Sequence, residues 1–524
     1  MRIIHIMRAY QHMERFIRFH ILIMAGLILF SNNKTNANPA DSSDNRPNIV
    51  LLLTDDLGYG DVGCYNPQSK APTPYMDKLA REGRRFTDAH SPTSVCSPTR
   101  YAILTGRYAW RTRLKLGVLN PWDKALIEPD RLTLGDMLKN QGYTTAAFGK
   151  WHLGWSWATP NGISQEQEKN EDFVKRIELT QPIKDGPTTR GFDYFFGMVG
   201  MTPDPCLIEN DKPIMIGSGK APTSPGVSSD LLAPWKIENT PSMLNEKVKW
   251  YLDQRAADPS KKPFFLYYAL TTPHQPIMPS AQFRGKTGFG EACDFVHQTD
   301  DSIGQVLNSL EKNGMLKNTI VIVTSDNGSP GYAEANSPTA SVMDRYDHLS
   351  SGPWRGMKGD TFEGGHRVPF IIRWPGRITP NTVSKENICL VDLMATFAAI
   401  TGAKLPNEAA EDSYDISAAF QPQPPSKPIR EATVHHALIG MFAIRQGPWK
   451  LIQGIGSGGF TMPQFIAIAP GDVGRNGNRG QLYNLENDPA ESHNLYQSNP
   501  QMVEKLSQLL DQYQKSGRST PLRP

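Results

Sequence analysis

The chain has 524 residues, of which 39% are hydrophobic and 20% are charged. This length is too great for one ordinary hydrophobic core, and the composition excludes global disorder and a minimal binding module. Residues 1–37 hold five of the 55 Lys and Arg residues and one of the 52 Asp and Glu residues, which leaves 50 bases and 51 acids in the remainder. The chain after residue 37 is therefore nearly neutral and lacks the basic excess of a nucleic-acid binder. A site for an anionic substrate has to be a local pocket.

The first 37 residues have the order of parts found in an export signal. A basic start is followed by an apolar stretch, Ile21–Phe30, and by small polar residues that end at Ala37. The apolar stretch is shorter than the roughly 20 residues that a membrane-spanning helix needs, which disfavours the alternative of a retained anchor. We therefore predict a signal peptide over residues 1–37, export to the periplasm or beyond the cell, and no stable membrane insertion after cleavage.

Five short β-branched or aromatic runs alternate with helical patterns, which predicts an α/β domain with a largely parallel sheet. The runs cover residues 48–53, 143–148, 264–270, 319–324 and 370–372. Ligands of open α/β sheets bind beyond the carboxyl ends of the strands. We therefore expect the polar residues that follow the first four runs to share one crevice: Asp55, Asp56, Lys150, His152, His274, Asp326 and Asn327.

Residues 155–235 and 329–352 have little periodicity and are predicted to be long loops. A Pro-rich stretch over 421–428 is typical of a linker into a smaller C-terminal unit with strands near 441–445 and 449–452 and a closing helix. The predicted organisation is a signal peptide over 1–37, a catalytic domain over 46–424 and a C-terminal subdomain over 425–524.

Cys96 precedes a predicted helix whose first turn holds Pro98. The exposed amides and the dipole at a helix amino terminus attract an anion, and Arg100 lies one turn further on. Taken alone, Cys96 fits an inert buried thiol and the Asp55–Asp56 pair fits a helix cap. Together with Asp326 and Asn327 the two carboxylates favour a metal.

The Cys-x-Pro-x-Arg run at 96–100, followed by Leu-Thr-Gly-Arg at 104–107, is similar to the activation motif of the type I sulfatases, which include arylsulfatases and N-acetylgalactosamine-6-sulfatases. The resemblance extends from about Pro47 to the carboxyl end. It implies an alkaline-phosphatase-like α/β fold with a large, mixed, mostly parallel sheet between helices, and a smaller C-terminal α+β subdomain with an antiparallel sheet. In this family a maturation enzyme converts the Cys to formylglycine (3-oxoalanine).

The resemblance also implies the chemistry. One hydroxyl of a hydrated aldehyde at residue 96 attacks sulfur, and the other later expels sulfate as the aldehyde re-forms. A calcium ion (Ca²⁺) is implied at the diol and the sulfate, held by oxygen ligands from Asp55, Asp56, Asp326, Asn327 and residue 96. Carboxylate and amide oxygens suit calcium and argue against zinc.

The remaining roles follow from the same resemblance. Arg100 and Lys150 hold diol and sulfate oxygens, and His152 assists the elimination. Lys358 contacts the sulfate near the leaving oxygen, and His274 donates a proton to the departing alcohol.

His435 and His436 open the C-terminal unit, which in this family often borders the pocket, so substrate contact is one hypothesis and a structural pair is the other. A Gly-rich segment at 454–459 resembles those of sulfatases acting on sulfated polysaccharides. We expect a sulfated carbohydrate substrate such as a galactose or N-acetylgalactosamine 6-sulfate. A phosphonate or phosphodiester hydrolase and a non-catalytic binder of sulfated glycans are the alternatives, and the oligomeric state stays open.

Overall fold

The computed structural model describes residues 46–162, 170–200, 207–214, 224–227, 236–331, 333–334, 337–341, 346–423, 425–462 and 479–523. The predicted signal peptide lies outside these residues. Residues Arg46–Pro524 cluster into one compact unit. In the described part of the chain, no helix combines the length and the apolar character that crossing a membrane requires.

The strands of the large sheet run in the order β13-β2-β12-β9-β1-β8-β4-β5-β6-β7. Its central five strands are parallel to one another, and the strands on either side, β12 and β6, join β9 and β5 in the antiparallel sense. The predicted mixed, mostly parallel sheet is therefore confirmed. The central strands are β9 (Thr319–Ser325), β1 (Asn48–Thr54), β8 (Phe264–Ala269), β4 (Thr144–Lys150) and β5 (Tyr194–Met198). The flanking strands are β13 (Thr382–Ser384), β2 (Arg84–Phe86), β12 (Phe370–Arg373), β6 (Leu207–Glu209) and β7 (Lys212–Ile214).

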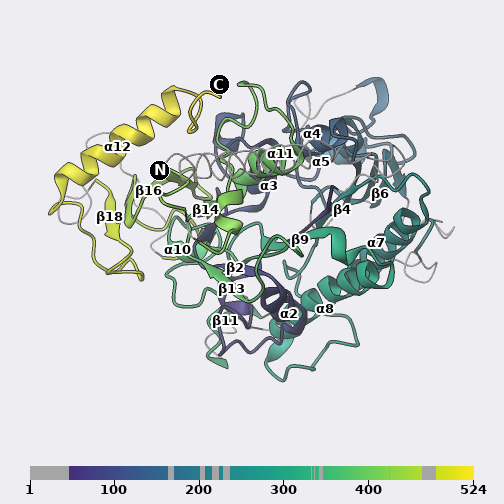
Figure 1. Ribbon diagram of the computed structural model, residues 1–524, viewed down its shortest axis with the longest axis horizontal. Helices are drawn as coiled ribbons and strands as arrows, with labels where there is room; N and C mark the ends of the chain where they lie inside the picture. The colour runs from purple at the N-terminus through teal and green to yellow at the C-terminus, as the bar shows by residue number, and fades with distance from the viewer. Residues whose placement is uncertain are drawn as a thin grey trace, which may run out of the picture. The chain divides into compact units, whose positions relative to one another are not determined.

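Both faces of the sheet are buried, so its central strands are apolar throughout rather than alternating. In β1, Ile49, Leu51 and Leu53 belong to one core, and Val50 and Leu52 belong to the other. One set of helices covers each of these two cores, and the two sets lie on opposite sides of the sheet in Figure 1. The first core is covered by α3 (Cys96–Thr105), α4 (Leu134–Asn140) and α11 (Leu393–Thr401), and the second by α2 (Pro74–Glu82), α7 (Thr240–Ala257) and α8 (Gly290–Lys312).

Strands β4 and β8 approach each other closely where β4 nears its carboxyl end. Gly149 has a φ of 88°, and a Cβ at this position would lie 1.9 Å from the carbonyl oxygen of Ala269. Only glycine fits there. This contact places Lys150, the last residue of β4, next to the strand that leads to His274.

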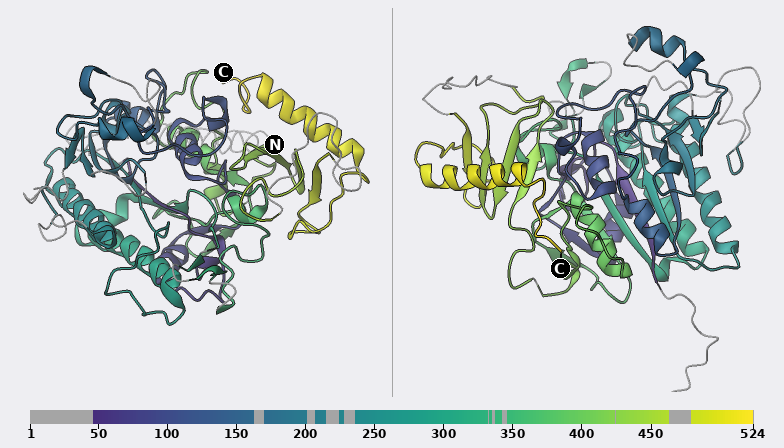
Figure 2. Two further views of the ribbon diagram at one scale, coloured as in Figure 1. Left: turned by 180° about the vertical axis from the view of Figure 1, so that it is seen from behind. Right: turned by 90° about the horizontal axis from the view of Figure 1, so that it is seen from above.

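The C-terminal part contains a separate antiparallel sheet with a helix packed against it, as expected (Figure 2). Its core includes Val434, Ile444, Leu451, Leu506 and Leu510. The elements are β15 (Thr433–His436), β16 (Phe442–Gln446), β17 (Trp449–Ile452), β18 (Gln481–Asn484) and α12 (Pro500–Lys515). The boundary between residues 424 and 425 stays a prediction.

The two predicted long loops contain regular structure, so that expectation was wrong in part. The first includes α5 (Asn170–Lys175) and strands β5, β6 and β7, and β5 lies in the parallel part of the large sheet. Its aromatic run, Tyr194–Phe196, is too short to stand out in a Gly- and Pro-containing region. The second loop holds the antiparallel strands β10 (Ala333–Glu334) and β11 (Ser337–Ser341). Further short elements outside the two loops include β3 (Ala89–His90), β14 (Ile388–Cys389) and α10 (Glu363–His366).

Candidate active site

Parallel strands β1, β8, β4 and β9 end at one edge of the large sheet, and the candidate residues follow these ends. Asp55 and Asp56 follow β1, and Asp326 and Asn327 follow β9. Because Thr54 pairs with Ser325, the four side chains start from adjacent positions. The backbone N–H of Asp56 donates to Oδ1 of Asp326 (3.2 Å), which joins the two strand ends directly.

Cys96 is the first residue of α3 and is 2% exposed. Its Sγ lies 3.6 Å from Oδ1 of Asp55. Burial raises the pKa of the Cys96 thiol to about 12, although Lys150 and Lys358 act in the opposite direction. The unmodified side chain is therefore a protonated thiol at neutral pH, and the thiol form is a poor nucleophile.

Arg100, one turn into α3, ties the helix to two strand ends. Its Nε and Nη2 donate to Oδ2 of Asp326 at 3.0 and 2.6 Å, and its Nη1 donates to the carbonyl oxygen of Lys150 at 2.7 Å. The guanidinium is fully buried and also lies 3.5 Å from Oδ1 of Asp55. Arg100 thus fixes the helix that carries Cys96 against the metal-ligand candidates.

Two lysines pair with the carboxylates that follow β1. Nζ of Lys150 donates to Oδ2 of Asp55 (2.8 Å), and Nζ of Lys358 donates to Oδ2 of Asp56 (2.7 Å). Together with Arg100 and Asp326, these four residues form a charged centre of three cations and three carboxylates, all nearly buried. Their formal charges cancel, and a divalent cation bound together with a divalent anion would leave the net charge of the centre unchanged.

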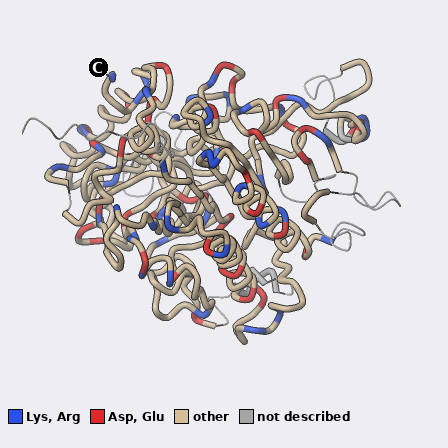
Figure 3. The backbone as a smooth tube through the Cα atoms, turned by 45° about the vertical axis from the view of Figure 1, so that its right-hand side comes forward, with Lys and Arg blue, Asp and Glu red and all other residues tan. Residues whose placement is uncertain are grey.

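Over the described chain, Lys and Arg residues are interspersed with Asp and Glu residues (Figure 3).

The carboxylates have divergent acidities because they crowd together. Burial opposes ionisation of Asp55, but the charges of Lys150, His274 and Arg100 hold its pKa below the ordinary value. Burial and the neighbouring charge of Asp55 raise the pKa of Asp326. Two close carboxylates resist simultaneous ionisation, and a bound cation relieves this repulsion.

The donor set fits a hard divalent cation. Ligand atoms of Asp55, Asp56, Cys96 and His274 all lie within 4.8 Å of one another, and Asp326 and Asn327 lie beside Asp56. Oxygen atoms thus form most of the donor set, as a hard cation requires. Nδ2 of Asn327 donates to Oδ1 of Asp56 (2.7 Å), whereas Oδ1 of Asn327 is buried without a hydrogen-bond partner among the described residues. A buried acceptor without a donor is costly unless a cation or water meets it.

His152 follows β4 with a φ of 55°, in the left-handed region that side chains seldom adopt. Two contacts hold it there: its backbone N–H donates to the carbonyl oxygen of Val199, and its Nε2–H donates to that of Leu119 (2.9 Å). Nδ1 therefore carries the lone pair, and it has no partner among the described residues. Burial, together with Lys150 and Arg100, holds the pKa of His152 well below 6.5, so the imidazole is neutral.

His274 follows β8, and its Nε2 lies 3.7 Å from Oδ2 of Asp56. Its Nδ1–H donates to the carbonyl oxygen of Gln275 (2.6 Å), which leaves Nε2 to face the centre. Burial lowers the pKa of His274, although the charge of Asp56 opposes this shift. The structure thus brings His274 together with the metal-ligand candidates.

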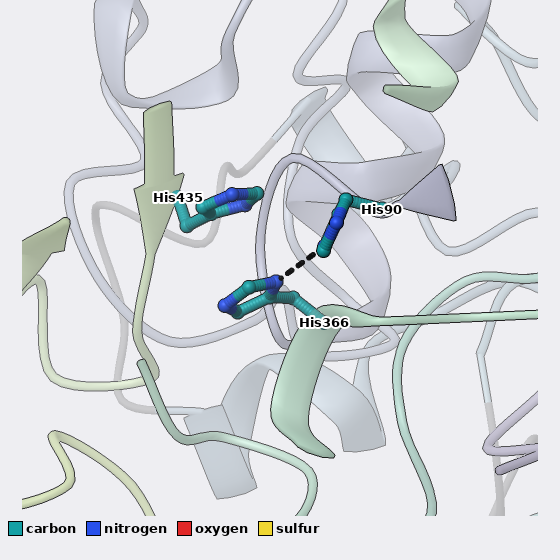
Figure 4. Close-up of side chains that lie close together, drawn as sticks. All are labelled: His90, His366 and His435. Atoms are coloured by element: carbon teal, nitrogen blue, oxygen red, sulfur yellow. Dashed lines mark hydrogen bonds between the residues drawn. The ribbon is translucent and has the colours of Figure 1, made fainter. Parts of the chain in front are cut away.

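His435 and His436 lie on β15, which is joined to the segment before Cys96 by the N–H of Ser94, a donor to the carbonyl oxygen of His436 (3.1 Å). The His435 ring is fully buried and stacks on His366, with ring centroids 3.7 Å apart, next to His90 (Figure 4). His436 is 5% exposed and its ring packs against Phe442. The burial of His435 favours the structural alternative, and substrate contact by either residue stays a prediction.

Sequence patterns did not indicate some of the residues that shape the centre. The carbonyl oxygen of Leu119 orients His152, and a backbone carbonyl leaves no signal in residue type. The backbone N–H of Gly359 donates to the carbonyl oxygen of Ser94 (2.8 Å), which fixes the loop after Lys358 against the segment before Cys96.

Comparisons with known proteins agree with this geometry. The family model described as Sulfatase matches residues 47–403. The chain is 31% identical to an N-acetylgalactosamine-6-O-sulfatase of Bacteroides thetaiotaomicron over 93% of this chain and 97% of the relative. It is 32% identical to human arylsulfatase A over 88% of this chain and 87% of the relative. A solved structure from a study of glycosaminoglycan metabolism by Bacteroides thetaiotaomicron matches with a TM-score of 0.73 and 27% identity, covering 90% of this chain and all of that one.

The large mixed sheet between helices, with a charged centre at the ends of its parallel strands, is a fold that this chain shares with solved sulfatase structures. The chain belongs to the sulfatase family. It is a sulfatase, an enzyme that hydrolyses sulfate esters.

Proposed function

We propose that this sulfatase hydrolyses the sulfate ester of a carbohydrate through a formylglycine hydrate derived from Cys96, with calcium bound beside it. The observation that carries the proposal is the position of Cys96: buried at the start of α3, 3.6 Å from Asp55, in a centre where three cations face three carboxylates. A sulfate group requires the cations, and a hard metal requires the carboxylates.

The acidity of Cys96 favours the modified side chain as the nucleophile. A thiol with a pKa of about 12 supplies almost no thiolate at neutral pH. A hydrated aldehyde at this position would supply one hydroxyl to attack sulfur as the bond from sulfur to the alcohol oxygen breaks, and loss of the proton of the second hydroxyl would expel sulfate as the aldehyde re-forms. The maturation enzyme that makes formylglycine is therefore a required partner.

Asp55, Asp56, Asp326, Asn327 and residue 96 are the proposed calcium ligands. The unpartnered Oδ1 of Asn327 and the crowded carboxylates support this assignment. A bound calcium ion would neutralise charge on the sulfate oxygens and lower the pKa of the nearby hydroxyl. Zn²⁺ is disfavoured because its sites in proteins are built mainly from sulfur and nitrogen ligands.

The surrounding side chains orient the substrate and move protons. Arg100 and Lys150 provide positive charge beside residue 96, and Lys358 provides it on the Asp56 side. His152 presents a neutral Nδ1 that can accept a proton from the second hydroxyl. His274 presents Nε2 toward the centre and, when protonated, donates to the departing alcohol oxygen.

The substrate class is proposed from the relatives. One is named an N-acetylgalactosamine-6-O-sulfatase, and another was solved in a study of glycosaminoglycan metabolism. We therefore favour a galactose or N-acetylgalactosamine 6-sulfate. With the predicted signal peptide over 1–37, the enzyme acts in the periplasm or outside the cell on sulfated polysaccharides.

The test is the release of sulfate from matched substrates by matured enzyme. We expect turnover of galactose 6-sulfate, N-acetylgalactosamine 6-sulfate and a small aryl sulfate, and no turnover by the Cys96→Ala variant. Dominant turnover of an aryl phosphodiester of the same aryl group would instead establish the phosphodiesterase alternative. For His435 and His436, unchanged kinetics on aryl and sugar sulfates after replacement of both by Ala would exclude substrate contact.

A further inference from the structure

Exposed apolar side chains gather where three segments meet beside Lys358. The backbone N–H of Gly117 donates to the carbonyl oxygen of Leu438 (2.7 Å), and that of Leu438 donates to the carbonyl oxygen of Gly359 (2.9 Å). The N–H of Ile439 donates to the carbonyl oxygen of Gly458 (3.2 Å). Residues 116–118, 438–440 and 458–462 thus form one continuous surface.

Five of the ten exposed large hydrophobic residues in the described chain come from these segments, and we call them the apolar rim. Single exposed apolar side chains need no explanation, but a contiguous group is typical of a binding surface. Their exposed fractions are 61% for Leu116, 40% for Val118, 38% for Ile439, 44% for Phe460 and 76% for Met462.

The rim adjoins the charged centre on two sides. Phe460 packs on Gly359, since a Cβ on that glycine would lie 3.2 Å from Cδ2 of the ring. Gly359 directly follows Lys358, whose ammonium group pairs with Asp56. At the other end, Leu119 follows Val118 and its carbonyl oxygen holds His152.

We propose that the apolar rim is a ring-binding subsite, in which the face of Phe460 packs against the ring of the alcohol that carries the sulfate. The inference rests on the proposed function. A sulfate held in the charged centre leaves its alcohol portion outside, and Phe460 is an exposed aromatic side chain that packs on Gly359, the residue after Lys358. Binding sites combine apolar walls with a few convergent polar groups, and here the cations and the metal ligands supply the polar part.

Two kinds of ring share this chemistry, the C–H face of a pyranose and the face of an aryl group, and they are separated by substrate choice. Phe460→Ala, Phe460→Tyr and the wild type are compared on galactose 6-sulfate, phenyl sulfate and a straight-chain alkyl sulfate. Val383→Ala is the matched control, because Val383 is also 44% exposed but lies on edge strand β13.

For Phe460→Ala we expect KM for the ring substrates to rise about tenfold relative to KM for the alkyl sulfate, with kcat changed less than about twofold. Phe460→Tyr restores the wild-type ratio, and Val383→Ala leaves it unchanged. A larger effect on galactose 6-sulfate assigns the subsite to sugars, and a larger effect on phenyl sulfate assigns it to aryl groups. An unchanged ratio for both ring substrates overturns the proposal.

A binding measurement separates failure of this inference from failure of the proposed function. In the Cys96→Ala background, saturation-transfer NMR should show contact from protein to the ring protons of galactose 6-sulfate or phenyl sulfate, and Phe460→Ala should weaken it. Ring contact without turnover by the matured wild type would retain the subsite and refute the catalytic proposal. Turnover without ring contact would do the reverse.

Discussion

Arg100 donates two hydrogen bonds to the same carboxylate oxygen of Asp326, from Nε at 3.0 Å and from Nη2 at 2.6 Å. The two residues lie 226 positions apart in the chain and are fully buried. This contact joins the start of α3, which carries Cys96, to the end of β9, which carries two of the proposed metal ligands. One ion pair therefore fixes the proposed nucleophile relative to two of the proposed metal ligands.

Replacement of Arg100 by Lys should remove the paired geometry while keeping the charge. An ammonium group cannot reproduce the planar fork of donors, so Asp326 and the carbonyl oxygen of Lys150 lose fixed partners. We expect kcat to fall by about 10²–10³-fold, as for loss of one oriented donor in an active site. Steady-state kinetics on an aryl sulfate measures this.

Arg113→Lys is the matched control, because the exposed guanidinium of Arg113 donates to the backbone carbonyl oxygens of Lys124 and Ala125 and to no other group among the described residues. It should retain activity within about twofold. Wild-type kcat in Arg100→Lys would show that the ion pair does not position the reacting groups.

Replacement of Asp56 by Asn should weaken calcium binding, because a carboxylate ligand becomes a neutral amide. A ligand that binds only the folded state stabilises it by an amount that grows with the logarithm of its concentration over the Kd, about 2.7 kcal/mol at 100 times the Kd. We expect the calcium concentration that gives half the rise in Tm to increase at least about tenfold in the variant. Thermal unfolding during calcium titration measures this without turnover.

Asp511→Asn serves as the control for charge removal, since Asp511 is 55% exposed on α12. Its calcium response should equal that of the wild type. A Tm that calcium leaves unchanged in the wild-type protein would contradict the assignment of the metal.

The proposed role of His274 as proton donor predicts that the rate falls as pH rises, because an imidazole donates this proton only in its charged form. Burial lowers the pKa of His274 below 6.5, so the protonated fraction is lost as pH rises through a value in the acidic range. His274→Gln should reduce kcat by about 10²–10⁴-fold and remove this pH dependence. His493→Gln, at a side chain 83% exposed, should change neither. A wild-type profile that stays flat from pH 5 to pH 8 would exclude His274 as the proton donor.

The buried histidines near β15 should make folding stability sensitive to acid. Burial lowers the pKa values of His90, His366 and His435 below 6.5. Above about pH 6.5 all three histidines are neutral in the folded and the unfolded state. Below that pH they take up protons more readily in the unfolded state, so their contribution to the free energy of unfolding falls as pH falls. The charged groups packed around them are Asp88, Glu363, Arg367, Arg445, Lys450 and Glu491.

Each such histidine contributes up to about 1.4 kcal/mol per pH unit below that value. Urea unfolding of the wild type and of His366→Gln at pH 7.5 and 5.5 isolates one of them, because other titrating groups are common to both proteins. The variant should lose less of its stability on acidification than the wild type, whereas His493→Gln should not differ. Equal losses in wild type and His366→Gln would show that this cluster does not control acid stability.

Strongly apolar elements were predictable from sequence, and short or mixed ones were not. The run Asn48–Leu53 became β1 almost residue for residue, because a strand buried on both faces must be apolar throughout. By contrast, β5 was missed, since Tyr194–Met198 is a five-residue run whose parallel pairing with β4 depends on distant sequence. The antiparallel direction of β12 was also hidden, because strand direction leaves no mark on residue type.

The candidate site shows the same limit. The positions of Asp55 and Asp326 at strand ends were visible in sequence, because each carboxylate directly follows an apolar run. The pairing of Lys358 with Asp56 was not, since Lys358 lies in a loop and its partner is 302 positions away. The place of His435 among buried histidines depends on α10 and β3, which local patterns did not indicate.

The most direct test of the central claim is the mass of the tryptic peptide Phe86–Arg100, which contains Cys96, from protein purified from its native host. We expect the thiol-bearing side chain of Cys96 to be replaced by an aldehyde or its hydrate in the active fraction. An unmodified Cys96 in protein that releases sulfate at full rate would contradict the formylglycine mechanism.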